Sequence, residues 1–455
     1  MHRLVLPTVL AVGLGISQGG RAATPARADL ARVRAAVDGT GAEVEPALTP
    51  ITPLDAVLRI ALAHNPDVQE ARARVRERVE RAQAAGRLPD LEFKYEQWAV
   101  PTSQPVALGR ADALLMGFRQ TFPAPAVLDA RTRVAVEEAR MTLETAHTRE
   151  QEVVTQVRRA YAEFRRAEGE LAVHREHVDI ESGIVALARA GYQEGRGSQQ
   201  EVLRTVVELS RLHADLVGIE QERTSSHALL NALMGRPADA ALGRPEDLDP
   251  VALEARAAAV VPAVAEVRPE VAAAARAVDR SSAALDGARA DARWPSLMVG
   301  VDYFHVPDRA DPHAYGGMAS INLPWLNPAR RDEVRAAEHA LAADELALAS
   351  ARNVAGFQRT DARARFDAAH ALLAILDRDL LPQARRSFEA AQAGFAAGTL
   401  DGIGLHDALR SYQNVRVDRV RALARLEAAL ADLERAAGSA ARNGGGSTTA
   451  EEGGR

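Results

Sequence analysis

The chain has no cysteine, one lysine and few aromatic residues. Because none of its 455 residues is a cysteine, the sequence excludes disulfides, thiolate metal sites and a lipid anchor on an N-terminal cysteine. Aromatic residues make up 4% of the chain, which is low for one thick globular core. Ala, Arg, Glu and Leu dominate instead and favour long helices. The net charge of −6 offers no basic surface for nucleic acid.

Long hydrophobic runs are also missing beyond the N-terminus. The chain begins with "MHR", then "LVLPTVLAVGLGI" and "GGRAAT", which is the order of basic, apolar and small residues in a secretory signal peptide. We therefore expect residues 1–23 to be a signal peptide that is cut near Ala22 or Ala23. No other stretch approaches the roughly 18 apolar residues of a membrane-spanning helix. The exported chain is expected to be soluble or to cross a membrane as β-strands.

An internal duplication organises the rest of the chain. "HNPDVQEARARV" through "GRLPDLEF" parallels "VRPEVAAAARAV" through "ARWPSLMV", and "GYQEG" parallels "GFAAG". The register between the two copies stays nearly constant, which is typical of a repeat. We expect an extended leader over 24–50, a first repeat over 51–234, a linker over 235–265, a second repeat over 266–437 and a disordered tail over 438–455.

Each repeat is expected to contain two strands. Leu91, Phe93 and Tyr95 alternate with charged residues after a helix that we expect from Pro53 to Gly86, and this period of two is typical of a strand with one apolar face. We predict strands over 91–100, 113–122, 297–305 and 315–323. About nine or ten residues suffice for a tilted strand to cross a membrane.

Apolar residues at spacings of three and four indicate long coiled-coil helices around the strands. The run from Ala126 to Ala190 lacks a strong helix breaker, and at 1.5 Å per residue it would extend roughly 100 Å. Few globular domains can use such a helix, whereas a structure that bridges a wide compartment can. The fold class is therefore expected to be mainly α with a small β part.

Four strands are too few to close a membrane barrel by themselves. Small barrels need about eight strands, and open strand edges in lipid leave backbone groups without partners. We therefore expect the subunits to pool strands, and three chains would give about twelve, which is enough for a channel. The alternative is a soluble four-stranded sheet that caps a helical bundle.

The duplicated pattern resembles the TolC-type outer-membrane efflux proteins. The resemblance is carried, in order, by "ALAHNPDVQEARARV", "GRLPDLEF" with "ARWPSLMV", "RQTFPAPAVLDAR", "GYQEGRGSQQEVL" and "LLPQARRSFEAAQAGFAAGTLDGIGLHDALRSY". It covers about residues 50–437. It implies a homotrimer with a twelve-stranded barrel in the outer membrane and a helical tunnel in the periplasm. Pro89, Pro123, Pro295 and Pro324 would then mark the corners between barrel and tunnel, because proline suits a place where a strand ladder stops and a helix begins.

The resemblance also implies partners and a passive role. Proteins of this family dock to a periplasmic adaptor protein that is linked to an inner-membrane pump. "RQTFPAPAVLDAR" looks most like the heavy-metal branch, whose pumps are of the resistance–nodulation–division (RND) type. The sequence contains no phosphate loop, HExxH or G-x-S-x-G motif, so we expect neither an enzyme nor a cofactor. The alternatives are a multidrug or type I protein-secretion duct and, from another class, a periplasmic coiled-coil adaptor or scaffold.

The resemblance places the functional region at the periplasmic tip, where the helix pairs turn. The adaptor would meet the tip turns at Gly191, Gly195, Gly394 and Gly398. In the family, the helix after the second turn often carries two aspartates that ring the closed aperture. In "GTLDGIGLHDAL" the second falls on Asp407, whereas the first falls on Gly404, which departs from the pattern. The remaining candidates at this aperture are Asp401, Glu201, Arg410 and Arg204.

Carboxylates from three subunits would concentrate negative potential at such a constriction, and Arg410 and Arg204 are candidate partners for Asp407. The alternative is that Asp407 is a solvated residue on the surface of a helix.

The histidines give only weak candidates for metal ligands. His174 and His177 are three residues apart on a helix and can share one face, but two ligands without a third make a weak site. His305 and His313 lie in or beside the predicted outer loop, close in sequence to Asp308 and Asp311. A passive channel need not bind its cargo tightly, so these histidines do not identify a substrate.

Overall fold

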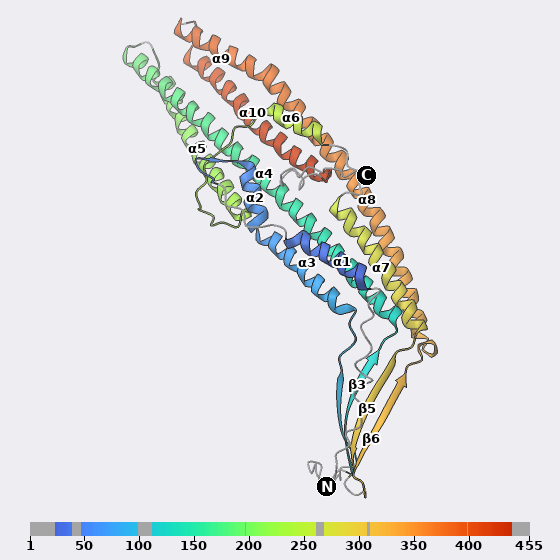
Figure 1. Ribbon diagram of the computed structural model, residues 1–455. Helices are drawn as coiled ribbons and strands as arrows, with labels where there is room; N and C mark the ends of the chain where they lie inside the picture. Colours follow the sequence, from blue (N-terminus) through green and yellow to red (C-terminus); the bar gives the residue numbers. More distant parts are fainter. Residues whose placement is uncertain are drawn as a thin grey trace, which may run out of the picture. The chain divides into compact units, whose positions relative to one another are not determined.

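The computed structural model describes residues 23–38, 47–98, 112–195, 197–260, 268–306, 310–397 and 399–438 (Figure 1). Two repeats follow each other along the chain, each with a helix, two antiparallel strands and long helices that form a hairpin. This confirms the predicted fold class, which is mainly α with a small β part. The predicted signal peptide lies outside the described residues except for Ala23, and the predicted tail lies outside them except for Gly438.

The two repeats use the same order of elements. The first comprises α2 (Leu54–His64), α3 (Pro66–Ala85), β2 (Glu92–Trp98), β3 (Ala113–Phe122), α4 (Pro125–Gln193) and α5 (Gln199–Leu233). The second comprises α7 (Pro269–Arg293), β5 (Leu297–His305), β6 (His313–Ile321), the 3-10 helix η3 (Pro324–Leu326), α8 (Ala329–Ile375), α9 (Leu381–Ala396) and α10 (Gly402–Ala436).

The long helix of the second repeat differs from α4 by one wide turn. A π-helical turn, η4 (Leu376–Leu380), joins α8 to α9, and the N–H of Leu381 donates to the carbonyl of Leu376. Pro382 follows directly in the first turn of α9. Because proline has no N–H and its ring crowds the preceding turn, a wider turn relieves the conflict without ending the helix.

The chain forms two compact units, and the first contains the four-stranded sheet. Its strand order is β2-β3-β5-β6, with every neighbouring pair antiparallel. Phe93 pairs with Phe118, which pairs with Val301 on β5. Side chains of one face therefore follow one another across the sheet, and β2 and β6 are its edges within the described residues.

Two strands differ in their bounds from the prediction. β2 ends at Trp98, and residues 99–111 are not among those described. β6 runs from His313 to Ile321, two residues earlier than predicted, because His305 pairs with His313 and Leu297 with Ile321. The glycines of "AYGG" suggest a loop, but pairing with β5 keeps this stretch extended.

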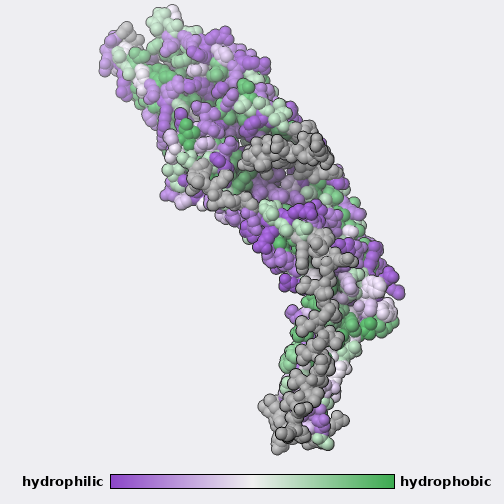
Figure 2. Space-filling view, in the orientation of Figure 1, coloured by the Kyte–Doolittle hydropathy of each residue, from purple (hydrophilic) through white to green (hydrophobic). Residues whose placement is uncertain are grey.

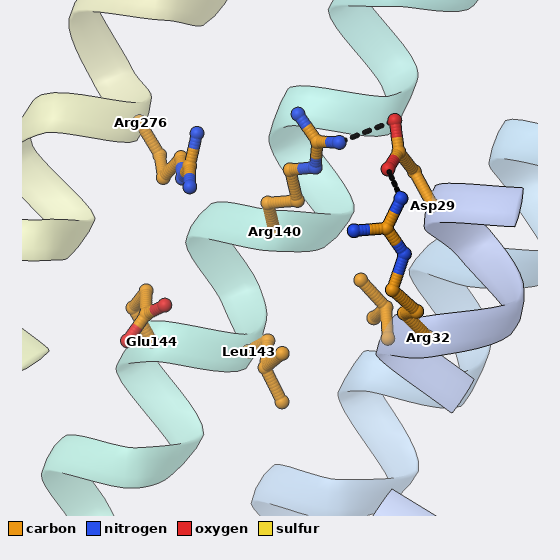
Figure 3. A pocket seen from close by; sticks show the side chains of 7 residues that line it. Asp29, Arg32, Arg140, Leu143, Glu144 and Arg276 are labelled. Atoms are coloured by element: carbon orange, nitrogen blue, oxygen red, sulfur yellow. Dashed lines mark ion pairs between the residues drawn. The ribbon is translucent and has the colours of Figure 1, made fainter. Parts of the chain in front are cut away.

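The extended leader predicted over 24–50 is wrong over residues 24–38, which belong to helix α1 (Ala23–Asp38). Leu30, Val33 and Val37 recur at spacings of three and four and are buried, as expected for one face of a helix. Asp29 forms ion pairs with Arg32 and with Arg140 of α4, beside a hollow of about 260 Å³ (Figure 3). The Ala-rich composition and this apolar stripe explain why the segment is helical.

The second unit holds the larger hydrophobic clusters. Tyr161 and Phe164 of α4 pack with residues of α2 and the end of α5 in one of them. The predicted linker contributes helix α6 (Pro250–Ala259), whose Leu253 and Ala257 are buried in a cluster with α8 and α10. It also contributes the short strand β4 (Arg244–Pro245), which pairs in parallel with β1 (Ile51–Thr52). The predicted linker is therefore partly a packed element.

The helix predicted from Pro53 to Gly86 divides at Asn65. Its side-chain Oδ1 accepts hydrogen bonds from the N–H groups of Asp67 and Val68, at 2.9 and 3.3 Å. Asn65 is extended and directly precedes Pro66, as expected because proline disfavours a helical conformation in the residue before it. Asn65 therefore ends α2 and caps α3.

Polar residues cover most of the helical surface in the view of Figure 2. Charged side chains occupy the outward positions of the long helices, many in ion pairs three or four residues apart. In the described part of the chain, every helix is too short or too polar to cross a lipid bilayer.

Candidate functional site

Two helix turns bring the predicted tip residues into position. In the first turn, Gly191 lies in the last turn of α4, and Gly195 adopts a φ of 75°, a conformation that favours glycine. The N–H of Gly197 donates to the carbonyl of Gly191 at 3.1 Å. In the second turn, the carbonyl of Gly394 accepts from the N–H groups of Thr399 and Leu400. Gly398, the fourth predicted glycine, lies outside the described residues.

A side-chain cap begins the helix after each turn. Ser198 accepts a hydrogen bond from the N–H of Glu201 at 3.1 Å and starts α5. Asp401 accepts one from the N–H of Gly404 at 2.9 Å and starts α10. Such caps satisfy N–H groups that lack a partner within the helix. The carboxylate of Asp401 thus has a structural partner in its own helix.

The starts of α5 and α10 lie against each other within the second unit. A Cβ placed on Gly402 would approach Glu201 Oε1 to 2.3 Å, so only glycine fits beside this carboxylate in its present position. The departure at Gly404 has a similar local reason, since a Cβ there would approach Leu400 Cδ1 to 2.6 Å. The glycines of "GIG" therefore permit close packing at the place where the family pattern has its first aspartate.

Asp407 and the two predicted arginines line one shallow hollow of about 430 Å³ between α5 and α10. Asp407, Arg204 and Arg410 are all exposed. Among the described residues, no ion pair joins Asp407 to either arginine, so their pairing stays a prediction. The hollow also contains Glu208 and His406.

A buried histidine–carboxylate cluster beside this hollow was missed by the sequence reasoning. His406 Nδ1 lies 3.2 Å from Glu181 Oε2 of α4, and His406 Nε2 lies 3.9 Å from Glu208 Oε1 of α5. The contact with Glu181 raises the pKa of His406, against the opposing effect of burial. Burial lowers the pKa of the neighbouring His177.

A signal for this cluster was present in the heptad spacing of α4. Val173, His177, Glu181 and Ile184 recur at intervals of four, four and three, and all four are buried. A charged residue on such an apolar stripe requires a partner. The sequence shows that Glu181 needs one but does not show that it is His406.

The predicted histidine pairs occupy two different environments. His174 Nδ1 lies 3.0 Å from the carbonyl of Glu170, while His177 is buried beside the cluster. His305 and His313 face each other across β5 and β6, with ring centroids 5.1 Å apart. In the parts of the chain that the structure describes, no three His, Asp or Glu residues are arranged to hold a metal ion.

The four predicted corner prolines each lie between a helix and a strand. Pro89 follows α3, and its carbonyl accepts from Gln120 Nε2 at 2.8 Å. Pro123 lies between β3 and α4, and Pro295 between α7 and β5. Pro324 starts η3 after β6 and is buried. The chain therefore changes from helix to strand, or from strand to helix, at each of these positions.

The sheet has two chemically different faces. On one face Phe93, Tyr95, Phe118 and Val301 are exposed. The opposite face carries Glu92, Lys94, Arg119 and Asp302, which alternate with them along the strands. An exposed apolar face of this kind requires a cover or a nonpolar solvent.

Comparisons with known proteins agree with this architecture. The family model described as "Outer membrane efflux protein" matches residues 57–236 and 260–439, so both repeats are covered. A comparison with curated protein sequences finds no match.

Several solved structures share the fold at low identity. The structure of CusC has a TM-score of 0.73 at 15% identity and covers 88% of this chain and 95% of its own. The outer-membrane channel OprN has a TM-score of 0.70 at 17% identity, with coverage of 85% and 90%. The outer membrane protein VceC from Vibrio cholerae has a TM-score of 0.68 at 18% identity, with coverage of 85% and 96%.

Proposed function

Because the chain belongs to the outer membrane efflux protein family, we propose that it is a passive exit duct in which three copies join their sheets into one twelve-stranded barrel. The single observation that carries this proposal is the four-stranded sheet with one exposed apolar face and two edges, β2 and β6. In lipid, unpaired edges are too costly to persist, so β6 of one subunit would pair with β2 of the next. The polar face would then line a water-filled lumen.

The duct would connect to two partners in the cell envelope. A periplasmic adaptor would meet the helix turns at Gly191, Gly195, Gly394 and Gly398, and an inner-membrane pump, of the RND type in our proposal, would supply the energy. Asp407 of the three subunits would form the aperture, with Arg204 and Arg410 near it. Support for this arrangement comes from the shared hollow that these three residues line.

The chain would reach the outer membrane after export by its signal peptide, with most of its mass in the periplasm. With no cysteine in the sequence, it would be held by its strands and not by a cysteine-linked lipid. Cell fractionation tests this location. The protein should stay with the outer membrane after a high-salt wash, and its release by salt would favour the soluble scaffold.

For the cargo we propose heavy-metal cations, supported by the corner sequence "RQTFPAPAVLDAR". A multidrug or type I protein-secretion duct shares the same fold and is the second candidate. Growth of a deletion strain should be measured across divalent metals, silver, copper, dyes and antibiotics. Sensitivity to metals alone, reversed by the gene, is the expected result, and sensitivity to drugs and dyes alone would overturn the heavy-metal assignment.

Assembly is tested separately from the cargo. The protein extracted in mild detergent should have the mass of a trimer, measured by light scattering with a correction for bound detergent. A monomer that keeps its helical circular dichroism in the same detergent would contradict the pooled barrel. This measurement does not depend on which solute passes.

A further inference from the structure

The cluster around His406 joins three helices next to the helix turns. His406 lies in the second turn of α10, Glu181 near the end of α4 and Glu208 in the third turn of α5. The two ring nitrogens of His406 point to different carboxylates: Nδ1 lies 3.2 Å from Glu181 Oε2, and Nε2 lies 3.9 Å from Glu208 Oε1. Both nitrogens of an imidazole are donors only when it is protonated. The protonated ring can therefore bridge α4 and α5 to α10, whereas the neutral ring can donate to one carboxylate only.

Because the His406–Glu181 pair is buried, the protonation state of His406 affects the stability of the contact between α10 and α4. Glu181 has no exposed surface and His406 is 7% exposed. Within the described structure, the second carboxylate oxygen of Glu181 has no hydrogen-bond partner. A buried carboxylate is costly without a nearby positive charge. Loss of the proton from His406 would leave the Glu181 carboxylate buried without that positive charge. Separation of α10 from α4 would let water solvate the carboxylate.

Other charged or titratable groups surround the cluster. From α4 come His174 and His177, and His177 Nε2 is buried without a partner among the described residues. From α9, the side chains packed nearby are apolar, including Phe388 and Phe395. From α5 and from α10 itself, the charged residues that line the hollow beside His406 and Glu208 are Arg204, Arg211, Asp407 and Arg410.

The two buried histidines respond to pH in opposite directions. The pKa of His406 is raised above its ordinary value of 6.5 by Glu181, so its stabilising contact is fully present below 6.5 and is lost as the pH rises through the raised pKa. Burial lowers the pKa of His177, so its neutral form is favoured in the packed state, and acid below 6.5 weakens that packing. Above 6.5, His406 is the member of this pair whose charge changes.

We propose that protonated His406 acts as a clamp that holds the start of α10 against α4 and α5, so that these helix ends separate less readily near neutral pH than in alkaline medium. The proposal rests on the proposed function as a duct, in which this separation opens the tip. The ligand that controls this contact is a proton on His406, and its loss allows the helix ends to separate. The periplasmic pH would thus set how easily a partner opens the duct.

Channel recordings in planar bilayers test the effect on opening. The full-length protein and its His406→Gln variant should be compared at about pH 6.5 and about pH 8.5, a window in which a perturbed histidine can change its charge. The wild type should conduct about twofold more or better at the higher pH, whereas His406→Gln should conduct at the higher level at both. His370→Gln is the matched control, because His370 lies 2.8 Å from Glu254 in an exposed pair, and it should behave as the wild type.

Hydrogen exchange of the same proteins supplies a readout that does not require conduction. After correction for intrinsic rates, amides of residues 402–410 should lose protection between these two pH values in the wild type and not in His406→Gln. If His406→Gln folds poorly, Glu208→Gln takes its place as the test variant. It keeps Glu181 unchanged, and it should reduce the pH response relative to the wild type. An equal pH response in the wild type and in the folded variants would overturn the clamp. Absence of conduction in all proteins, with the exchange pattern as expected, would count against the duct and not against the clamp.

Discussion

Phe93 and Phe118 pair across β2 and β3 with ring centroids 5.4 Å apart, and both side chains remain more than half exposed. An aromatic pair on a water-facing sheet gains little from this contact and exposes a large apolar area. The same pair in contact with lipid acyl chains would bury that area. In the barrel that we propose, this face of the sheet would meet the membrane, and the first prediction follows from that.

Val301→Arg should impair assembly in the outer membrane. Val301 is the middle residue of β5 and is 56% exposed on the apolar face. An arginine near the bilayer midplane of a barrel costs about 2–4 kcal/mol. We expect fewer trimers in the outer-membrane fraction, measured by quantitative immunoblotting of unheated samples. Val251→Arg on α6 is the control, since Val251 is also exposed, and equal losses in both variants would argue against a lipid-facing sheet.

Asp407→Ala should change ion conduction through the duct. Three carboxylates at one aperture would attract cations and favour block by multivalent ones, so their removal should weaken that block or raise conductance. Single-channel recording with and without a trivalent cation measures both. Asp418→Ala, at an exposed aspartate farther along α10, should leave them unchanged. If Asp407→Ala also leaves both unchanged, Asp407 is an ordinary solvated residue.

Tyr161→Phe should destabilise the second unit. The Tyr161 hydroxyl donates to the carbonyl of Thr52 at 2.6 Å and accepts from the N–H of Glu246 at 3.0 Å. Its loss leaves two backbone groups of the β1–β4 region without this partner, at a cost of about 1–3 kcal/mol. The midpoint of urea unfolding, followed by circular dichroism, should fall. Tyr412→Phe should have little effect, because the Tyr412 hydroxyl has no hydrogen bond among the described residues, and a similar fall in both variants would contradict the assignment.

Glu427→Gln should flatten the pH dependence of stability. Burial raises the pKa of Glu427 from 4.5 to about 7, although Arg165 and Arg256 oppose this. A carboxyl with a raised pKa contributes stability that is present below 4.5 and lost as the pH rises through about 7. The contribution lost between these limits is about 3 kcal/mol.

The midpoint of urea unfolding should be measured for the wild type and the variants at about pH 5 and about pH 8. The other carboxyl groups contribute equally to the pH dependence of each protein. The wild-type midpoint should fall between these values by more than that of Glu427→Gln. Glu176→Gln is the control, because the hydrogen bond from Arg416 lowers the pKa of Glu176 below its ordinary value of 4.5. The contribution of such a carboxyl is lost only as the pH falls below that value, so this variant should keep the wild-type fall. A wild-type slope that survives in Glu427→Gln would show that Glu427 does not titrate in this range.

Local periodicity was sufficient for most of the fold. Alternation over Phe93 and Tyr95 predicts a strand, and the unbroken run after Pro125 predicts a very long helix, because both patterns depend on neighbours within a few residues. The leader was predicted wrongly, since its Pro and Thr residues suggested extension while Leu30, Val33 and Val37 pack on one helix face. The predicted linker likewise contains α6, whose burial depends on contacts with α8 and α10.

By itself, the sequence determined the duplication, and the two strands and the long helices of each repeat, and it led to our proposal that several chains share one sheet. These follow from spacing, chain length and the cost of unpaired backbone groups in lipid. The tertiary structure alone decided which side chains meet. His406 and Glu181 are 225 residues apart in the chain and 3.2 Å apart in space, because the packing of α10 against α4 buries the two together, and no local pattern records that contact.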